Sequence, residues 1–183
     1  MKKIVLTFGL ISGGIQALMM AVMVPLYMNR TVAFDKGEVI GYTSMILSFL
    51  LVFFGIRTYR ENAGGSITFG KAFKVGILIT LITCAIYVVT WQILYYNFFP
   101  NFMDAYAEQM VAGMQASGAS DAVILAKQQE MARYKELYAN PLINVGITFL
   151  EIFPVGLIVA LVSAAILRRK PAPDAPPYAA AAA

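Results

Sequence analysis

The sequence has no histidine, a single cysteine among its 183 residues, and charged side chains at only 13% of its positions. The lack of histidine removes the usual general base, the usual zinc ligand and the usual switch at physiological pH. It also excludes a Ser-His-Asp triad and a histidine-based zinc protease site. Cys84 alone provides neither a disulfide within the chain nor a cysteine metal cluster. We therefore expect no enzyme, no metal and no cofactor.

Apolar residues make up 60% of the sequence, against roughly 45–50% in soluble domains. The mean hydropathy is accordingly high, at +0.71. Four stretches carry almost no charge over the roughly 17–25 residues that a helix needs to cross the bilayer core: 4–27, 39–56, 75–96 and 142–167. Since lipid offers backbone amides no partner, each should span as a helix. The sequence thus predicts an all-α polytopic membrane protein, with one membrane domain over residues 1–170.

The first stretch has an alternative interpretation as a cleaved signal peptide, because Lys2 and Lys3 precede it. Its apolar length exceeds the roughly 7–15 residues of a signal core, which favours a span.

The basic residues divide unevenly between the two sides of a four-span protein. One side would hold Lys2, Lys3, Arg57, Arg60, Lys71, Lys74, Arg168, Arg169 and Lys170, and the other Arg30, Lys36, Lys127, Arg133 and Lys135. The richer side is cytoplasmic by the positive-inside rule. We therefore expect a multi-pass protein of the bacterial inner membrane with both termini in the cytoplasm. The net charge of +4 serves orientation and lipid contact in this arrangement, and we expect no nucleic-acid partner.

The connection between the third and fourth spans, about residues 98–140, is long and has helical periodicity. Phe102, Tyr106, Met110 and Met114 recur at every fourth residue, and Leu125, Met131, Tyr134, Leu137 and Tyr138 form a second, looser stripe. The pattern predicts an external amphipathic helical hairpin whose first stripe forms an interface. Residues 171–183, rich in proline and alanine, are expected to form a disordered cytoplasmic tail.

Glu151 is the one ionisable residue deep within a predicted span. Gln16 lies at a matching depth in the first span, Thr148 precedes Glu151 by one turn, and Pro154 follows it and frees a backbone carbonyl. These four residues are a candidate intramembrane polar cluster. Glu151 is either a proton or cation site, or a protonated residue whose hydrogen bonds join helices.

Two further features have mainly structural interpretations. Gly9 and Gly13, four residues apart, favour close helix packing, within the chain or with a second copy. The glycine-rich loop between the second and third spans lies beside bases that we expect to contact lipid headgroups: Arg57, Arg60, Lys71 and Lys74. It lacks the Walker spacing of a phosphate-binding loop.

Three stretches resemble an uncharacterised bacterial family of four-span membrane proteins, domain of unknown function 4199. They are residues 37–45 (GEVIGYTSM), 54–60 (FGIRTYR) and 66–76 (SITFGKAFKVG). The likeness covers roughly residues 1–170. It implies a four-helix inner-membrane architecture with a long external connection between the last two spans, and no established activity, cofactor or catalytic residue.

Two functions follow as hypotheses. The first is a structural or accessory membrane protein that binds a partner or itself through the external arm and helix faces, as a homo-oligomer or a subunit of a membrane complex. The alternative is a small oligomeric transporter or ion-conducting protein that uses the carboxylate of Glu151.

Overall fold

The computed structural model describes residues 1–32 and 34–170, and these form six helices and no strand. The helices are α1 (Lys2–Met28), α2 (Phe34–Asn62), α3 (Phe69–Asn97), α4 (Phe102–Ala116), α5 (Asp121–Ala139) and α6 (Pro141–Leu167). The all-helical prediction is confirmed. The predicted tail, 171–183, lies outside the described residues.

Four of these helices are long and apolar enough to cross a membrane, with mean hydropathies from 1.8 to 2.4. They are Lys2–Met28, Val39–Asn62 within α2, Phe69–Asn97 and Pro141–Leu167. Each contains one of the predicted stretches, so four helices long and apolar enough to span lie where the sequence predicts four spans. At about 1.5 Å per residue these helices exceed the roughly 30 Å hydrocarbon core, and polar turns continue them beyond it. The outward leucine, isoleucine and valine side chains are compatible with lipid contact.

Local chemistry sets several helix ends. The Thr68 hydroxyl accepts a hydrogen bond from the backbone N–H of Lys71 at 3.4 Å and caps the start of α3. The Asn140 side chain accepts from the N–H of Leu142 at 3.0 Å, and Pro141 occupies the first turn of α6, where its missing N–H costs little.

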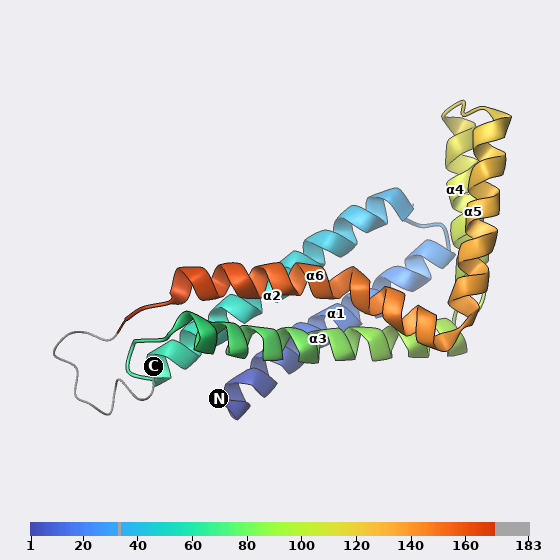
Figure 1. Cartoon of the computed structure of the whole chain (residues 1–183). Coiled ribbons are helices and arrows are strands. Elements are labelled where there is room, and N and C mark those ends of the chain that lie inside the picture. Colours follow the sequence, from blue (N-terminus) through green and yellow to red (C-terminus); the bar gives the residue numbers. More distant parts are fainter. Residues whose placement is uncertain (33, 171–183) are drawn as a thin grey trace.

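The four long helices form a bundle in which α2 and α3 touch across the middle (Figure 1). Both α1 and α6 pack against this central pair, so α1 and α6 occupy opposite corners. Glycines allow close approach. A Cβ atom at Gly9 would lie 2.8 Å from the Ile82 side chain, and one at Gly13 would lie 2.4 Å from Ile86. Within the chain, these two glycines therefore pack α1 against α3.

The loop between α2 and α3 is fixed to the end of α6. Gly64 and Gly65 turn the chain with positive φ angles of 81° and 84°. Ile67 then pairs with Arg169 through two backbone hydrogen bonds of 3.0 and 2.9 Å. Ile67 is 1% exposed, so this glycine-rich loop has a structural role that accounts for its composition.

Helices α4 and α5 form an antiparallel hairpin across the other end of the bundle, at a steep angle to the long helices (Figure 1). Gly118, with a φ of 77°, makes the turn. The buried residues of the hairpin are Met103 and Met131. Two helices thus lie where the sequence predicts an arm. That the hairpin is external to the membrane stays a prediction.

Candidate functional site

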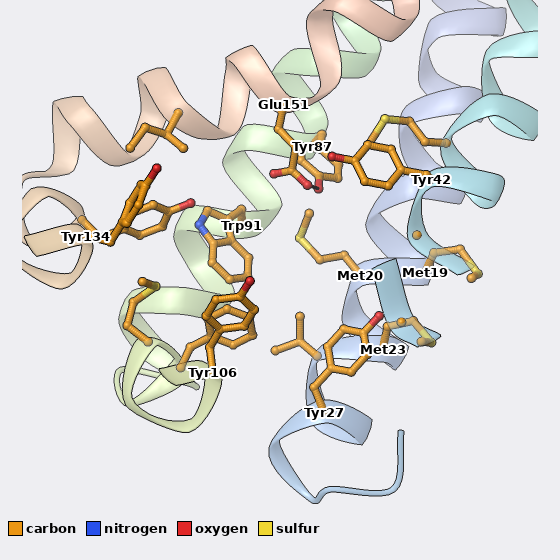
Figure 2. A pocket seen from close by; sticks show the side chains of 18 of the residues that line it. Met19, Met20, Met23, Tyr27, Tyr42, Tyr87, Trp91, Tyr106, Tyr134 and Glu151 are labelled. Atoms are coloured by element: carbon orange, nitrogen blue, oxygen red, sulfur yellow. Dashed lines mark hydrogen bonds between the residues drawn. The ribbon is translucent and has the colours of Figure 1, made fainter. Parts of the chain in front are cut away.

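A cavity of about 560 Å³ lies where the hairpin meets the bundle, and each of the six described helices contributes to its wall (Figure 2). The wall is unusually rich in two kinds of side chain. The methionines are Met19, Met20, Met23, Met45, Met103 and Met131. The aromatic residues are Tyr27, Tyr42, Tyr87, Trp91, Phe102, Tyr106, Tyr134 and Tyr138. Such a wall is apolar in bulk and carries hydroxyl groups at defined points.

Glu151 reaches this cavity from α6, ten residues or about 15 Å after the helix begins. The Tyr87 hydroxyl of α3 donates a hydrogen bond to Glu151 Oε1 at 3.3 Å. Figure 2 shows the hydroxyl of Tyr42, from α2, pointing toward the same carboxylate. Helices α2, α3 and α6 thus converge on one acidic group at the inner end of the cavity.

Gln16 lines the same cavity from α1, at the opposite corner of the bundle. Its amide nitrogen donates to Ser48 Oγ at 2.6 Å and to the Ser44 carbonyl at 3.3 Å, both on α2. Both amide hydrogens of Gln16 are therefore directed to α2, and this residue joins two helices within the core.

The other two members of the predicted cluster lie outside the cavity wall. Thr148 is 2% exposed, and its hydroxyl donates to the Asn144 carbonyl at 2.8 Å within α6. Pro154 is exposed on the outer face of α6. The structure therefore brings Glu151 and Gln16 to one cavity. Thr148 is buried and Pro154 is exposed, and neither lines that cavity.

Asn144 is a polar residue of the site that the sequence interpretation missed. It is fully buried, and its Oδ1 accepts hydrogen bonds from Trp91 Nε1 at 3.1 Å and Gln92 Nε2 at 2.8 Å. This amide fixes the indole that forms part of the cavity wall. The sequence could have indicated this residue, because an amide inside a predicted span needs a hydrogen-bond partner there.

The hairpin meets the bundle through aromatic rings of the predicted arm stripe. Phe102 packs edge-on against Trp91 with ring centroids 4.9 Å apart and stacks with Tyr106 at 6.5 Å. Both Phe102 and Tyr106 line the cavity, whereas Met110 and Met114 are half-buried and do not. Half of the predicted stripe thus packs toward the protein itself.

Polar contacts bind the hairpin to the end of α1. The Arg30 guanidinium pairs with Glu108 at 3.0 Å, and Gln109 Nε2 donates to the Tyr27 carbonyl at 3.0 Å. The Arg30 and Glu108 side chains are 70% and 67% exposed, so their pair contributes less than about 1 kcal/mol.

The hairpin side of the cavity carries a second charged pair. Lys127 Nζ lies 3.0 Å from Glu130 Oε2 one turn along α5, and both residues line the wall.

At the end of the same helix, burial raises the pKa of the Tyr138 phenol to about 12, and the nearby negative charge of Glu151 adds to the rise. Tyr138 therefore stays protonated at neutral pH and keeps a hydrogen to donate.

The four bases expected at lipid headgroups lie at the other end of the bundle and differ in their contacts. Arg57 pairs with Glu61 at 2.9 Å, and Arg60 donates to the Leu167 carbonyl at 3.3 Å. Lys74 is exposed and Lys71 half-buried. Arg60 thus helps to fix α6, and lipid contact by the group stays a prediction.

Within residues 1–32 and 34–170, no three histidine, cysteine, aspartate or glutamate side chains lie close enough together to hold a metal ion. The cavity therefore has the chemistry of one carboxylate, one lysine–glutamate pair, phenol hydroxyls, aromatic faces and thioethers. These groups suit the binding of a largely apolar molecule with a polar or charged centre.

A family model described as "Protein of unknown function (DUF4199)" matches residues 7–169, which include all four long helices and the hairpin between them except the first residues of α1. No curated protein and no solved structure matches the chain.

Proposed function

Because the chain belongs to the DUF4199 family of unknown function, we propose its role from the cavity: it is a membrane protein that binds a small solute between its four spans and the α4–α5 hairpin. The observation that carries this proposal is the convergence of six helices on one cavity that contains Glu151. An ionisable residue within a membrane span is costly, so such residues usually mark a solute or ion pathway. A volume of about 560 Å³ suits a solute of drug size.

Binding fits the lining better than catalysis does. Thioethers and aromatic faces make up most of the contact area and take no part in proton transfer, while Lys127 pairs with Glu130. We therefore place the protein among carriers or receptors of solutes and not among enzymes. Of these two roles we favour transport, because carriers commonly place the residues that bind their solute or coupling ion inside the helix bundle, as Glu151 is placed here.

We place the protein in the bacterial inner membrane with both ends in the cytoplasm. The bases of the α2–α3 loop and those that follow α6 gather at one end of the bundle, and the hairpin covers the other (Figure 1). The positive-inside rule then makes the hairpin end external. The cavity would accordingly receive its solute from outside the cell.

The binding proposal is tested by filling the cavity. Gly41 lines the wall, and a Cβ atom at this position would meet nothing within 4 Å, so Gly41→Phe adds a ring without a clash at its first atom. Gly14→Phe is the matched control, because Gly14 is equally open but lies on the outer face of α1. Trp91 is the only tryptophan and lines the cavity, so its fluorescence reports occupancy.

The assay titrates detergent-solubilised protein with three aromatic probes of similar size: tetraphenylphosphonium, triphenylphosphine oxide and tetraphenylborate. We expect saturable quenching of Trp91 by at least one probe, weaker by about tenfold in Gly41→Phe and unchanged in Gly14→Phe. If quenching by every probe is the same in Gly41→Phe as in the wild type, the cavity is not a binding site and the proposal fails.

A second candidate function is the accessory role in which the hairpin binds a second copy of the chain. The observation that favours it is the exposure of Leu125 on α5, at 56%. A two-fold dimer across this side of α5 would cover Leu125 of both copies at once. Native mass spectrometry of Leu125→Asp should then show monomers where the wild type shows dimers. The control is Val123→Asp: Val123 is 52% exposed but, two residues away, lies on the opposite side of the helix, so this variant should remain dimeric. A monomeric wild type would exclude this role.

A further inference from the structure

We propose that the cavity selects organic cations with an apolar body, such as quaternary ammonium or phosphonium compounds, and that Glu151 supplies the opposite charge. This inference rests on the proposed binding function and names the chemical class of the solute. Three properties of the wall support it: its charge, its aromatic faces and its methionines.

Charge favours a cation. The charged residues that line the cavity are Lys127, Glu130 and Glu151, and the first two pair with each other at 3.0 Å. The wall is therefore net negative whenever Glu151 is ionised. An anionic solute would be repelled by the carboxylate. A neutral solute would displace water from the carboxylate but would not neutralise its charge. A cationic solute would neutralise it.

The aromatic faces favour the same charge. The π-face of a tyrosine or tryptophan is negative, and a cation within about 6 Å of such a ring is attracted to it, most strongly where water is excluded. The rings of the wall come from different helices: Tyr42 on α2 and Tyr87 on α3 lie beside Glu151, and Trp91 and then Tyr106 on α4 lie farther along the wall (Figure 2). A cation held near the carboxylate would thus lie next to aromatic rings, and its apolar groups would extend toward further rings.

Volume and methionines make the cation organic. A bare inorganic ion would leave most of the 560 Å³ unfilled, whereas an aryl or alkyl group would occupy it. Met20 projects between Trp91 and Tyr42 in Figure 2. Thioether side chains are flexible and polarisable, and they adapt to apolar groups of different shapes. We therefore expect tolerance of body shape together with selectivity for positive charge.

The test compares two ions of nearly the same shape and opposite charge, tetraphenylphosphonium and tetraphenylborate, by the quenching of Trp91 in one detergent. The wild type should bind the cation at least tenfold more tightly than the anion. Glu151→Gln should weaken cation binding about tenfold or more and leave the affinity for neutral triphenylphosphine oxide within about twofold. The neutral probe also shows that the variant retains its cavity. Glu151→Asp should keep the preference for the cation.

A second variant tests the aromatic contribution while keeping Glu151, and Tyr42→Phe serves as the control for the lost hydroxyl. Tyr42→Leu should weaken tetraphenylphosphonium binding by about 2- to 30-fold, the range expected for one cation–π contact, whereas Tyr42→Phe should restore most of it. This variant also keeps the proposal open to refutation if Glu151→Gln does not fold.

Failure of this inference differs from failure of the binding function. Equal affinities for the two ions, or a cation affinity that Glu151→Gln leaves unchanged, would overturn the cation proposal. If Gly41→Phe still weakened binding about tenfold in that case, the cavity would remain a binding site for another class of solute. If quenching of Trp91 is the same in Gly41→Phe as in the wild type, both the binding function and the cation preference are refuted.

Discussion

Gly156 of α6 lies at the closest contact between the central helices and the fourth span, and its replacement by alanine should destabilise the bundle. An added Cβ atom would lie 2.4 Å from Thr80 Cγ2 and 2.7 Å from Phe49 Cζ. Both neighbours are fully buried. Thr80 is β-branched and its hydroxyl donates to the Gly156 carbonyl at 3.4 Å, so it cannot turn away without losing that bond.

The magnitude follows from three effects. Overpacking in a tight core costs about 1–3 kcal/mol. Loss of the Thr80 hydrogen bond adds about 0.6 kcal/mol, the average for such bonds in membranes. Alanine regains about 1 kcal/mol through its higher helix propensity. We therefore expect Gly156→Ala to lower the free energy of unfolding by about 0.6–2.6 kcal/mol.

The measurement is equilibrium unfolding by SDS in mixed micelles, followed by circular dichroism. Gly146→Ala is the matched control on the same helix, because a Cβ atom there would meet nothing within 4 Å; it should be neutral or stabilising by up to about 1 kcal/mol. Equal stability of the two variants would refute the packing of α6 against α2 and α3 described above.

Three other predictions test separate parts of the fold. Gln16→Leu removes two hydrogen bonds to α2, including the one to Ser48 Oγ, and should lower stability by about 1–2 kcal/mol in the same SDS assay; unchanged stability would contradict this bond. Arg169→Pro removes the N–H that donates to the Ile67 carbonyl, so limited proteolysis of the α2–α3 loop should be faster than in the wild type. A cysteine at Ser120, in the hairpin turn, should react with an impermeant maleimide added outside intact cells; labelling only after permeabilisation would invert the topology.

The four spans could be predicted because hydropathy responds directly to the cost of placing a residue in lipid. The ends could not: α2 runs from Phe34 to Asn62 against a predicted 39–56. Beyond the hydrocarbon, helical turns continue through polar residues that keep their backbone bonds, and composition no longer marks where the helix stops. Hydropathy identifies the part of a helix that must be apolar because lipid surrounds it. It does not indicate how far the helix continues through polar residues.

Glu151 could be identified for the same reason, since one acid stands out in an apolar span. Its surroundings could not. Met103 and Met131 lie far along the chain from Met20, and all three line the cavity only because the hairpin folds back over the bundle. No periodicity within one segment encodes such a convergence, because it depends on the angle between helices.

The predicted arm stripe illustrates the limit of periodicity in another way. A four-residue repeat of apolar side chains correctly indicates that one face of α4 avoids water, but it does not identify what covers that face. Phe102 and Tyr106 pack toward the bundle and line the cavity, so the chain itself provides part of the cover. The case for a partner at this stripe is correspondingly weaker than the sequence alone makes it.

The way the hairpin is held links its fold to the proposed function. Its ion pair to α1, between Arg30 and Glu108, is largely exposed and contributes little. The contact of Phe102 with Trp91 contributes about 0.5–1.5 kcal/mol beyond the area it buries. The same rings that hold the hairpin on the bundle are therefore those that line the cavity. A solute that stacks on Trp91 would add contacts at this junction, so its binding and the docking of the hairpin should strengthen each other.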